Sequence, residues 1–412
     1  MAFQVSPGVL VQERDLTSII PAVSTSIGAV AGQFTKGPLD EIVSISSEQE
    51  LVETFGKPDV NNFEYFFSAA NFLQYSNSLR VVRANQTSQV NASTSGTGVL
   101  VKNTEDWTNN YASGGAAGNA TFVAREAGAY GNTLLVATCP NAAAYEENGA
   151  TTVNDASTSV GDTTITVTAG ANLNIGDVIS ISTTAATNDY DDGEQYRVTA
   201  ISTNDLTIVQ HPRGAGGLKR TITDGSNVRR RWRYYDAVDG APGTSEWTST
   251  RNGSNDEIHI VVVDEDGSIA GVPGQILETY SKVSKASDAK SPQGDDNYYP
   301  NVIYTKSRYI WWTKHHSSGS NWGNAASGTS FTAVDTPSNE SFAGGSDGSS
   351  VTTGQLKTAY DKFADSETVD VGLIISGKCD STHVENMITI AEARKDCVVF
   401  ASPERADVVN VT

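Results

Sequence analysis

The hydrophobic and polar positions near the start of the chain predict a β-strand with apolar side chains on both faces. After a Ser-Pro-Gly turn at residues 6–8, the side chains of residues 9–13 alternate between two faces. Pro21 prevents a helix from running on from residues 16–20. A strand with apolar side chains on both faces needs a partner sheet, in its own chain or in a neighbouring one. We therefore predict an N-terminal arm, residues 1–22, that pairs with a sheet.

Residues 23–86 carry the pattern of an α/β segment. Small and β-branched residues predict strands at residues 24–34 and 78–84. Between them, Ser47 and the glutamate three residues later fit the capping box of a helix, and a second helix is predicted over residues 63–75. The aromatic stripe of this second helix is expected to pack inward through Phe63, Phe66, Phe67, Ala70 and Leu73.

The middle of the chain has the composition of a β-rich region. From about residue 87 it is rich in Asn, Ser, Thr and Gly. Residues 146–212 contain hairpins with Gly or Asn-Asp turns, which predict a small antiparallel β-barrel-like or sandwich module in an outward-facing position. Further along, we predict strands at residues 258–263 and 309–312 and a short helix at residues 276–283.

The last sixty residues return to alternating helices and strands. A helix at residues 353–364 precedes a strand, a helix and a strand at 369–376, 382–395 and 397–402, the pattern of a βαβ unit with parallel strands. The predicted fold class is mixed α/β (α+β), a discontinuous α/β core domain with long β-rich insertions. Its predicted parts are the arm at 1–22, the core at 23–86 and 352–412, an inserted β-rich domain at 87–145 and 213–351, and the outer barrel-like module at 146–212.

Composition narrows the classes of partner. A formal net charge of -20 repels a phosphate backbone, so we expect no nucleic-acid partner. No apolar run approaches the ~20 residues of a membrane-spanning helix, and no direct membrane insertion is expected. Cys139, Cys379 and Cys397 lack the spacing of metal ligands and predict ordinary buried thiols.

One basic cluster interrupts the acidic composition. Arg229, Arg231 and Arg233 share one face of a strand predicted at residues 228–235. The pattern is typical of a solvated or salt-bridged strand face. Docking onto an acidic surface of another copy is the alternative.

No catalytic constellation stands out. The chain contains no GxxxxGK[ST], strand-bounded GxGxxG, GxSxG or HExxH motif, and the acidic turn at residues 264–267 lacks the downstream glutamate of a calcium loop. His315 and His316 point to opposite sides of an extended backbone, so we expect surface residues and not a metal pair. His383 and Glu385 face different sides of a helix. We therefore predict a protein that is not an enzyme, with no cofactor and with no catalytic, cofactor-binding or metal site.

Three stretches near the N-terminus match a known family in order and spacing. They are SPGVLVQERD, then IIPAVSTSIGAVAGQFTKGPLDEIVSISSEQELVETFGKP, then FSAANFLQYSNSLRVVRA. Residues 122–136, 258–290 and 369–403 fit the same pattern. With these stretches, the chain resembles the contractile tail sheath proteins of long-tailed, myovirus-type bacteriophages.

The resemblance implies a structural subunit of the virion. In this family, subunits polymerise as stacked hexameric rings into a helical sheath around the tail tube. Contraction from a stretched, high-energy state drives the tube through the host envelope for genome ejection, without nucleotide hydrolysis. The implied partners are other copies of the chain, the tail tube protein, and the baseplate and tail terminator proteins, and assembly is expected in the cytoplasm of the bacterial host.

The resemblance also assigns a role to the arm. Strand addition to a neighbour's sheet keeps subunits tied while their rigid bodies rotate and slide. The implied subunit-interaction residues are Val5, Val9, Leu10, Val11, Gln12, Glu13, Arg14 and Asp15. The implied hinge residues are Leu16, Pro21 and Ser24.

The family pattern continues past Thr412 into a C-terminal domain that holds the receiving sheet. The chain is therefore expected to lack that domain. If it is a fragment, we expect a monomer in solution with residues 1–20 poorly ordered.

Three other functions fit part of the pattern. The inserted β-rich domains also suit a surface adhesin or carbohydrate-binding virion protein, because aromatic side chains form such sites. The candidate aromatic residues are Trp107, Trp247, Trp311, Trp312 and Trp322. The sheath of a related bacteriocin or type VI-like injection machine would share the mechanics and differ in cargo. An enzyme is the third alternative, because clusters formed in space are not visible in a sequence.

Overall fold

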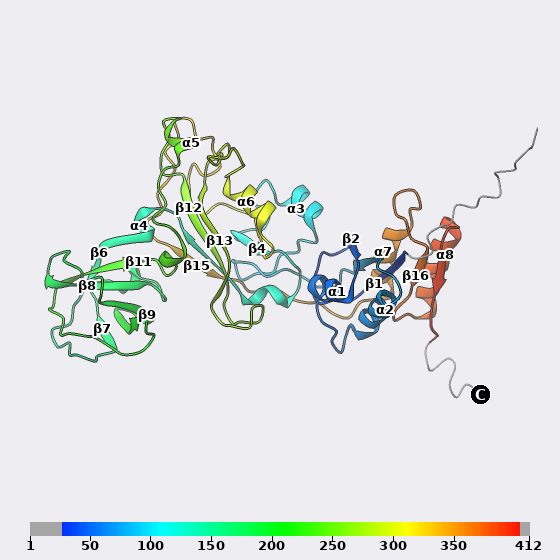
Figure 1. The fold of residues 1–412 in the computed structure, drawn as a ribbon, viewed down its shortest axis with the longest axis horizontal. Coiled ribbons are helices and arrows are strands. Elements are labelled where there is room, and N and C mark those ends of the chain that lie inside the picture. Colours follow the sequence, from blue (N-terminus) through cyan, green and yellow to red (C-terminus); the bar gives the residue numbers. More distant parts are fainter. Residues whose placement is uncertain (1–26, 404–412) are drawn as a thin grey trace, which may run out of the picture. The chain divides into compact units, whose positions relative to one another are not determined.

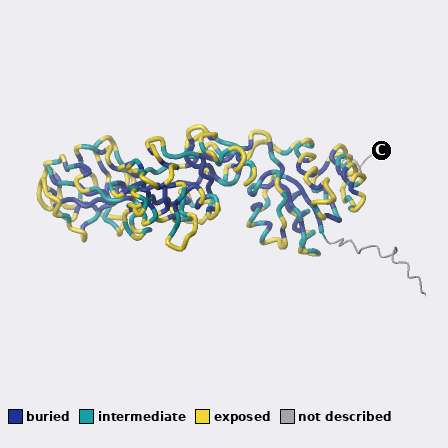
Figure 2. The backbone as a smooth tube through the Cα atoms, turned by 90° about the horizontal axis from the view of Figure 1, so that it is seen from above, coloured by how far each residue is buried: buried dark blue, intermediate teal, exposed yellow. Residues whose placement is uncertain are grey.

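The computed structural model describes residues 27–403. The chain divides into two compact units, whose elements are labelled in Figure 1. Unit 1 comprises Met1–Ser88 and Gly348–Thr412, and unit 2 is Gln89–Asp347. Each unit has its own buried core, visible in Figure 2 as dark blue segments. The predicted arm, residues 1–22, lies outside the described residues.

A five-stranded sheet is the centre of unit 1. Its strands are β1 (Gly28–Gly32), β2 (Ile42–Ile45), β3 (Leu79–Arg83), β16 (Leu373–Ile375) and β17 (Val398–Phe400). The strand order is β17-β16-β1-β3-β2, with β2 antiparallel to β3 and the other pairs parallel. Because β1 pairs with both β3 and β16, the early and late parts of the sequence share one sheet.

Four α-helices accompany this sheet. They are α1 (Glu48–Phe55), α2 (Phe63–Leu73), α7 (Thr353–Tyr360) and α8 (Ser381–Arg394). The predicted start of α1 is confirmed, since the Ser47 side chain accepts a hydrogen bond from the backbone N–H of Glu50. Gly56 ends the helix at a φ of 87°. The helix α8 connects β16 to β17, and the parallel pairing of these strands confirms the predicted βαβ unit.

The buried face of α2 differs from the predicted one. Of the five residues expected to face inward, Phe66 and Ala70 are buried, Leu73 is half-buried, and Phe63 and Phe67 are 46% and 49% exposed. The face is rotated because the Tyr65 ring packs directly over Gly32, where an added Cβ atom would lie 2.4 Å from the ring. This close approach is a tertiary contact between helix and sheet, and the helical pattern does not encode it.

Two buried arginines organise the loops of unit 1. Arg83 donates to three backbone carbonyls of residues 34–37 at 2.8–3.0 Å. Arg394 donates to backbone carbonyls in residues 363–371 and pairs with Asp396 at 2.9 Å. Each guanidinium therefore fixes a loop through the loop's own main chain.

Unit 2 contains a four-stranded antiparallel sheet and a separate strand pair. The four strands are β5 (Leu134–Cys139), β12 (Glu257–Asp264), β13 (Gln275–Ser284) and β15 (Ser338–Ser341), in the order β13-β12-β5-β15. The pair is β4 (Phe122–Ala124) with β14 (Ile310–Trp312). The helices nearby are α3 (Thr104–Asn110), α5 (Glu246–Ser249) and α6 (Tyr299–Lys306).

The helix predicted at residues 276–283 is wrong, because this segment lies within β13. The strand pairs with β12 from Gln275 to Ser284, with two irregularities in register. The partner strand is almost entirely buried and apolar. Pairing with such a strand overrides a local helical pattern in a short segment.

A six-stranded antiparallel sheet forms the remainder of unit 2, after the short helix α4 (Ala142–Tyr145). Its strands are β6 (Glu146–Thr152), β7 (Thr164–Thr166), β8 (Val178–Ala185), β9 (Gln195–Ser202), β10 (Asp205–His211) and β11 (Ser226–Arg231). The order is β6-β11-β8-β9-β10-β7. An isolated bridge between Val153 and Val167 joins segments next to the two edge strands. The sheet includes β11, which the sequence assigned to the neighbouring β-rich domain.

Candidate assembly surfaces and an aromatic pocket

All sequence-predicted interaction residues lie outside the described residues. This applies to the arm residues Val5, Val9, Leu10, Val11, Gln12, Glu13, Arg14 and Asp15, and to the hinge residues Leu16, Pro21 and Ser24. Candidate sites therefore come from the surfaces and cavities of residues 27–403.

Within residues 27–403, the side chains that commonly bind metals do not form a metal site. Among residues 27–403, no group of three or more His, Cys, Asp or Glu side chains is placed to hold a metal ion. No helix in the described part of the chain combines the length and apolar character needed to cross a bilayer. Cys139 and Cys379 are buried, as predicted, whereas Cys397 is half-buried.

In the acidic turn after β12, a carboxylate accepts hydrogen bonds from the backbone of the turn itself. Asp264 is buried and accepts hydrogen bonds from the backbone N–H groups of Gly267, Ile269 and Ala270. Burial opposes ionisation, but these bonds and one from the Thr133 hydroxyl hold the pKa of Asp264 below its usual value. The carboxylate therefore closes the turn.

The arginines of β11 form ion pairs within the sheet. Arg229 and Arg231 both pair with Asp192. Arg230 has a fully buried side chain and pairs with Glu147 at 3.0 Å. The salt-bridged interpretation is confirmed for Arg229 and Arg231, whereas Arg233 lies past the end of β11.

Apolar side chains gather along the outer side of α2. Phe63 and Phe67 lie one helical turn apart, and Val60 and Tyr75, beyond the two ends of the helix, are 84% and 91% exposed. Exposed apolar clusters mark protein–protein contacts. We call these four residues the α2 surface, a candidate assembly surface of unit 1.

The strand β17 is a second candidate. It forms one edge of the five-stranded sheet, and its Val398 and Phe400 side chains are 57% and 55% exposed. An edge strand presents main-chain groups that another strand can pair with. Nearby on α8, His383 is buried and Glu385 is exposed, which confirms that they face different sides.

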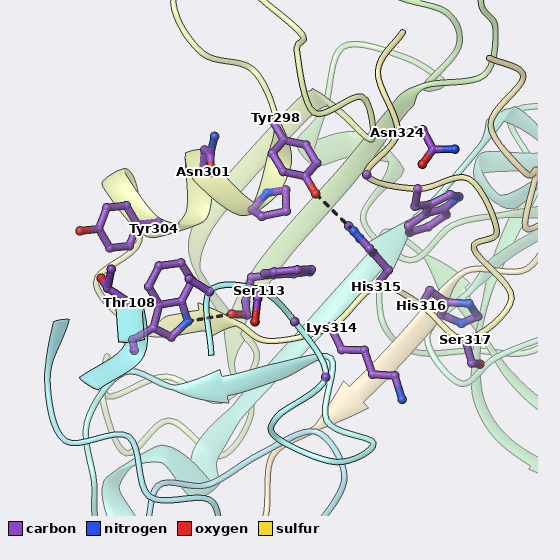
Figure 3. A pocket seen from close by; sticks show the side chains of 18 residues that line it. Thr108, Ser113, Tyr298, Asn301, Tyr304, Lys314, His315, His316, Ser317 and Asn324 are labelled. Carbon is purple, nitrogen blue, oxygen red and sulfur yellow. Dashed lines mark hydrogen bonds between the residues drawn. The ribbon is translucent and has the colours of Figure 1, made fainter. Parts of the chain in front are cut away.

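A cavity of about 770 Å³ opens in unit 2 beside β14 (Figure 3). Helices α3 and α6 and the segment after β14 supply its walls. The aromatic side chains that line it are Trp107, Tyr298, Tyr304, Trp312 and Trp322. Hydroxyl and amide side chains complete the lining. We call this cavity the aromatic pocket.

His315 and His316, both predicted to be surface residues, are half-buried. Two tyrosines at the start of α6 contact His315. The His315 Nδ1 lies 2.6 Å from the Tyr299 hydroxyl, and Nε2 lies 3.2 Å from the Tyr298 hydroxyl. Burial lowers the pKa of His315 to about 4. The ring is therefore neutral at pH 7, with a single N–H group.

Trp312 joins the same group of hydrogen bonds. Its indole Nε1–H, which only donates, lies 3.1 Å from the Tyr299 oxygen, so the Tyr299 hydroxyl accepts this bond. The neutral His315 ring carries one proton, so it donates to one of the two tyrosine oxygens and accepts from the other hydroxyl. These bonds hold the Tyr298 hydroxyl in place at the wall of the aromatic pocket.

The tryptophans expected to be exposed are mostly buried. Trp107, Trp311, Trp312 and Trp322 are all less than 8% exposed, and only Trp247 of the five is half-buried. Trp107 is stacked with both Tyr304 and Trp311, at centroid distances of 4.8 and 5.4 Å. Four of the five rings therefore serve the core, and their expected exposure is wrong.

Comparisons with known proteins agree on one family. A family model described as "Tail sheath protein Gp18 domain III N-terminal region" matches residues 25–84. The tail sheath protein of Enterobacteria phage T4 is 27% identical over 460 aligned positions, covering 98% of this chain and 63% of the relative. The tail sheath protein of a Vibrio phage, KVP40, is 41% identical over 78 residues, covering 19% of this chain and 12% of the relative.

A solved structure, the sheath tail protein Lin1278 from Listeria innocua, is 9% identical with a TM-score of 0.32, covering 90% of this chain and 44% of that chain. This similarity is too low to support an argument about the fold. The chain spans slightly less than two thirds of the length of the T4 protein. The matches confirm the resemblance predicted from the sequence: this chain is similar to the tail sheath proteins of bacteriophages.

Proposed function

We propose that this chain is a structural subunit of a contractile phage tail sheath. The observation that carries the proposal is the alignment with the T4 tail sheath protein, which covers 98% of the chain. Both curated relatives are phage proteins, which favours a phage sheath over the sheath of a bacteriocin or type VI-like machine. In this role the chain has no enzymatic activity and needs no cofactor.

The proposed action is mechanical. Copies of the chain form stacked hexameric rings around a tail tube, contact the baseplate and tail terminator proteins, and shorten together to drive the tube through the host envelope. The sheath forms in the host cytoplasm and becomes part of the virion. The proposed partners exclude nucleic acid, in agreement with the net charge of -20.

The proposed link between copies is the N-terminal arm. Val5 to Asp15 add a strand to a neighbour's sheet, and Leu16, Pro21 and Ser24 provide the hinge. Each main-chain hydrogen bond contributes only ~1 kcal/mol net, but several act along one arm. The link therefore holds while the bodies of the subunits rotate.

The two candidate surfaces of unit 1 support this assembly. The α2 surface exposes apolar side chains that a second copy would cover, and β17 is an edge strand of the sheet formed within residues 27–403. We assign the core role to residues 23–86 and 352–412. The insertions at 87–145 and 232–351 form the β-rich domain. Residues 146–231 form a barrel-like outer module, because β11 belongs to its sheet and the Val153–Val167 bridge joins its edge segments.

The test is polymerisation of the purified protein, followed by electron microscopy and sedimentation. We expect tubes or rings from a protein that includes the receiving sheet of the family pattern, and a folded monomer from the same protein without residues 1–20. Val9→Pro should also prevent assembly because it removes a main-chain N–H from the arm, whereas the matched Val9→Thr should preserve it. Unchanged tubes from the deletion would refute the arm's role. A protein that includes the receiving sheet and stays monomeric at all concentrations would refute self-assembly.

A further inference from the structure

The aromatic pocket of unit 2 has features of a ligand site that the sheath function does not use. Its volume of about 770 Å³ lies within the usual range of small-molecule sites, ~300–1,000 Å³. All of its lining residues belong to unit 2. The pocket therefore does not depend on how the two units are placed.

The charge of the pocket is opposite to that of the chain. The protein has 48 acidic and 28 basic residues, yet none of the residues that line the pocket is Asp or Glu. Its ionisable side chains other than tyrosines are Lys314, His315 and His316, and His315 is neutral at pH 7. Lys314 is half-buried, so its charge is partly shielded from solvent. This lining favours a ligand that carries an acidic group.

The pocket also presents a hydroxyl whose position is set by its neighbours. The bonds that link Trp312, Tyr299, His315 and Tyr298 hold the Tyr298 hydroxyl at the wall, and this hydroxyl has hydrogen-bonding capacity beyond its bond to His315. Figure 3 shows Tyr298 and His315 joined at one wall of the pocket, with Asn301 and Asn324 nearby. A preorganised hydroxyl beside amide side chains suits a ligand with several oxygen acceptors.

Glycine keeps this wall open. An added Cβ atom at Gly323 would lie 2.7 Å from His315 Nε2 and 3.2 Å from the Tyr298 hydroxyl. Gly323 also has a φ of +90°, which disfavours other residues. At Gly114, an added Cβ atom would lie 3.1 Å from the Trp312 ring. Backbone therefore approaches the aromatic wall closely at two points without filling the cavity.

We propose that the aromatic pocket binds a saccharide that carries a carboxylate. The half-buried rings of Tyr298 and Tyr304 meet the apolar faces of sugar rings, and the hydroxyl and amide groups meet the sugar hydroxyls. Tyr298 hydrogen-bonds a sugar hydroxyl, which can both donate and accept, and Lys314 attracts the carboxylate. Asn301 and Asn324 are both exposed at the rim, where they would contact an adjoining sugar unit.

The test is calorimetric titration of the full chain with three probes. Trigalacturonate combines sugar rings with carboxylates, maltotriose has sugar rings without charge, and citrate has carboxylates without sugar rings. We expect trigalacturonate to bind at least about tenfold more tightly than either of the others. Equal affinity for maltotriose would overturn the acidic specificity, equal affinity for citrate would overturn the saccharide, and no binding of trigalacturonate would overturn the site.

Two variants locate the binding. Tyr298→Phe removes the hydroxyl from the pocket wall and should weaken trigalacturonate binding by about three- to tenfold, as expected for one hydrogen bond. Lys314→Gln should weaken trigalacturonate but leave the weak affinity for maltotriose unchanged. Tyr309→Phe, which alters a half-buried tyrosine that does not line the pocket, is the matched control. Wild-type affinity in Tyr298→Phe, with an unchanged thermal midpoint, would overturn the assigned role of Tyr298.

Discussion

Both units bury arginine side chains, but the hydrogen-bonding groups of these side chains find partners to different extents. In unit 1, Arg394 donates to several backbone carbonyls and pairs with Asp396. In unit 2, Arg230 has two guanidinium nitrogens, Nε and Nη1, without a partner among the described residues. Close by, Asp177 is fully buried and likewise has one carboxylate oxygen without a partner in residues 27–403.

The difference shows when a buried charge stabilises a fold. A buried ion gains stability only if its hydrogen-bonding groups are met, because desolvation costs several kcal/mol per ion. Burial raises the pKa of Asp177 to about 6, although Arg230 and Arg233 oppose the shift. Burial therefore makes the ionised form of Asp177 unfavourable in unit 2, whereas the guanidinium of Arg394 stabilises the loop that it contacts in unit 1.

The largest expected effect is the loss of Arg394. Arg394→Met removes a guanidinium that bonds to backbone carbonyls in residues 363–371. The carbonyls would remain buried without donors, so we expect unit 1 to lose about 3–5 kcal/mol of unfolding free energy. Denaturant unfolding measures this loss. The exposed Lys362→Met is the matched control and should change stability by less than about 0.5 kcal/mol. Equal effects of both variants would contradict the role of the buried bonds.

A smaller effect, of opposite sign, is expected at Asp177. Its folded pKa of about 6 lies above the unfolded value, so the folded state binds the proton more tightly. Stability from this group is present at low pH and is lost as pH rises toward 6. Asp177→Asn removes the buried charge and should stabilise unit 2 by about 1–3 kcal/mol at pH 7.5.

Thermal unfolding at two pH values checks this prediction. The stabilisation by Asp177→Asn should largely disappear at pH 4, where the wild-type carboxyl is protonated. The exposed Asp224→Asn should change neither value. A variant less stable than wild type at pH 7.5 would mean that pairing with Arg230 outweighs the burial of Asp177.

The smallest effect on stability is expected at the α2 surface. Phe63→Ser combined with Phe67→Ser alters side chains that are about half exposed, so unit 1 should lose about 1 kcal/mol or less. Assembly, measured by sedimentation, should nevertheless weaken, because a second copy would cover these rings. In contrast, Phe66→Ala on the buried face should cost about 3–5 kcal/mol. Full assembly by the double variant would exclude the α2 surface as an interface.

Local signals explain which elements could be predicted. Ser47 and Gly56 cap the two ends of α1. Both caps bond to backbone groups only a few residues away, so the local sequence predicts them. The βαβ unit ending in β17 was also predictable from local signals, because one apolar run comes before the helix and another comes after it. By contrast, residues 276–283 form a strand because β12 lies beside them. The pairs run from Asp264–Gln275 to Glu257–Ser284, so the partner residues lie 11 to 27 positions away and leave no local trace.

The aromatic pocket shows the same limit at a candidate site. Adjacent histidines at residues 315–316 predicted a surface position, yet Tyr298 and Tyr299 enclose the first of them. The sequence contains both pairs of residues but no sign that α6 brings them together. The tryptophans were predicted to be exposed, but four of the five are buried in a core that forms only in three dimensions.

The position of β1 has a consequence for synthesis of the protein. Its register partner on β16 begins at Leu373, and the whole of unit 2 is translated before that residue. At ~5–20 residues per second, the ribosome needs on the order of tens of seconds to cover this interval. During that time β16 has not been synthesised, so one edge of β1 lacks its partner strand. Unit 2 therefore completes its own folding before the sheet of unit 1 is complete.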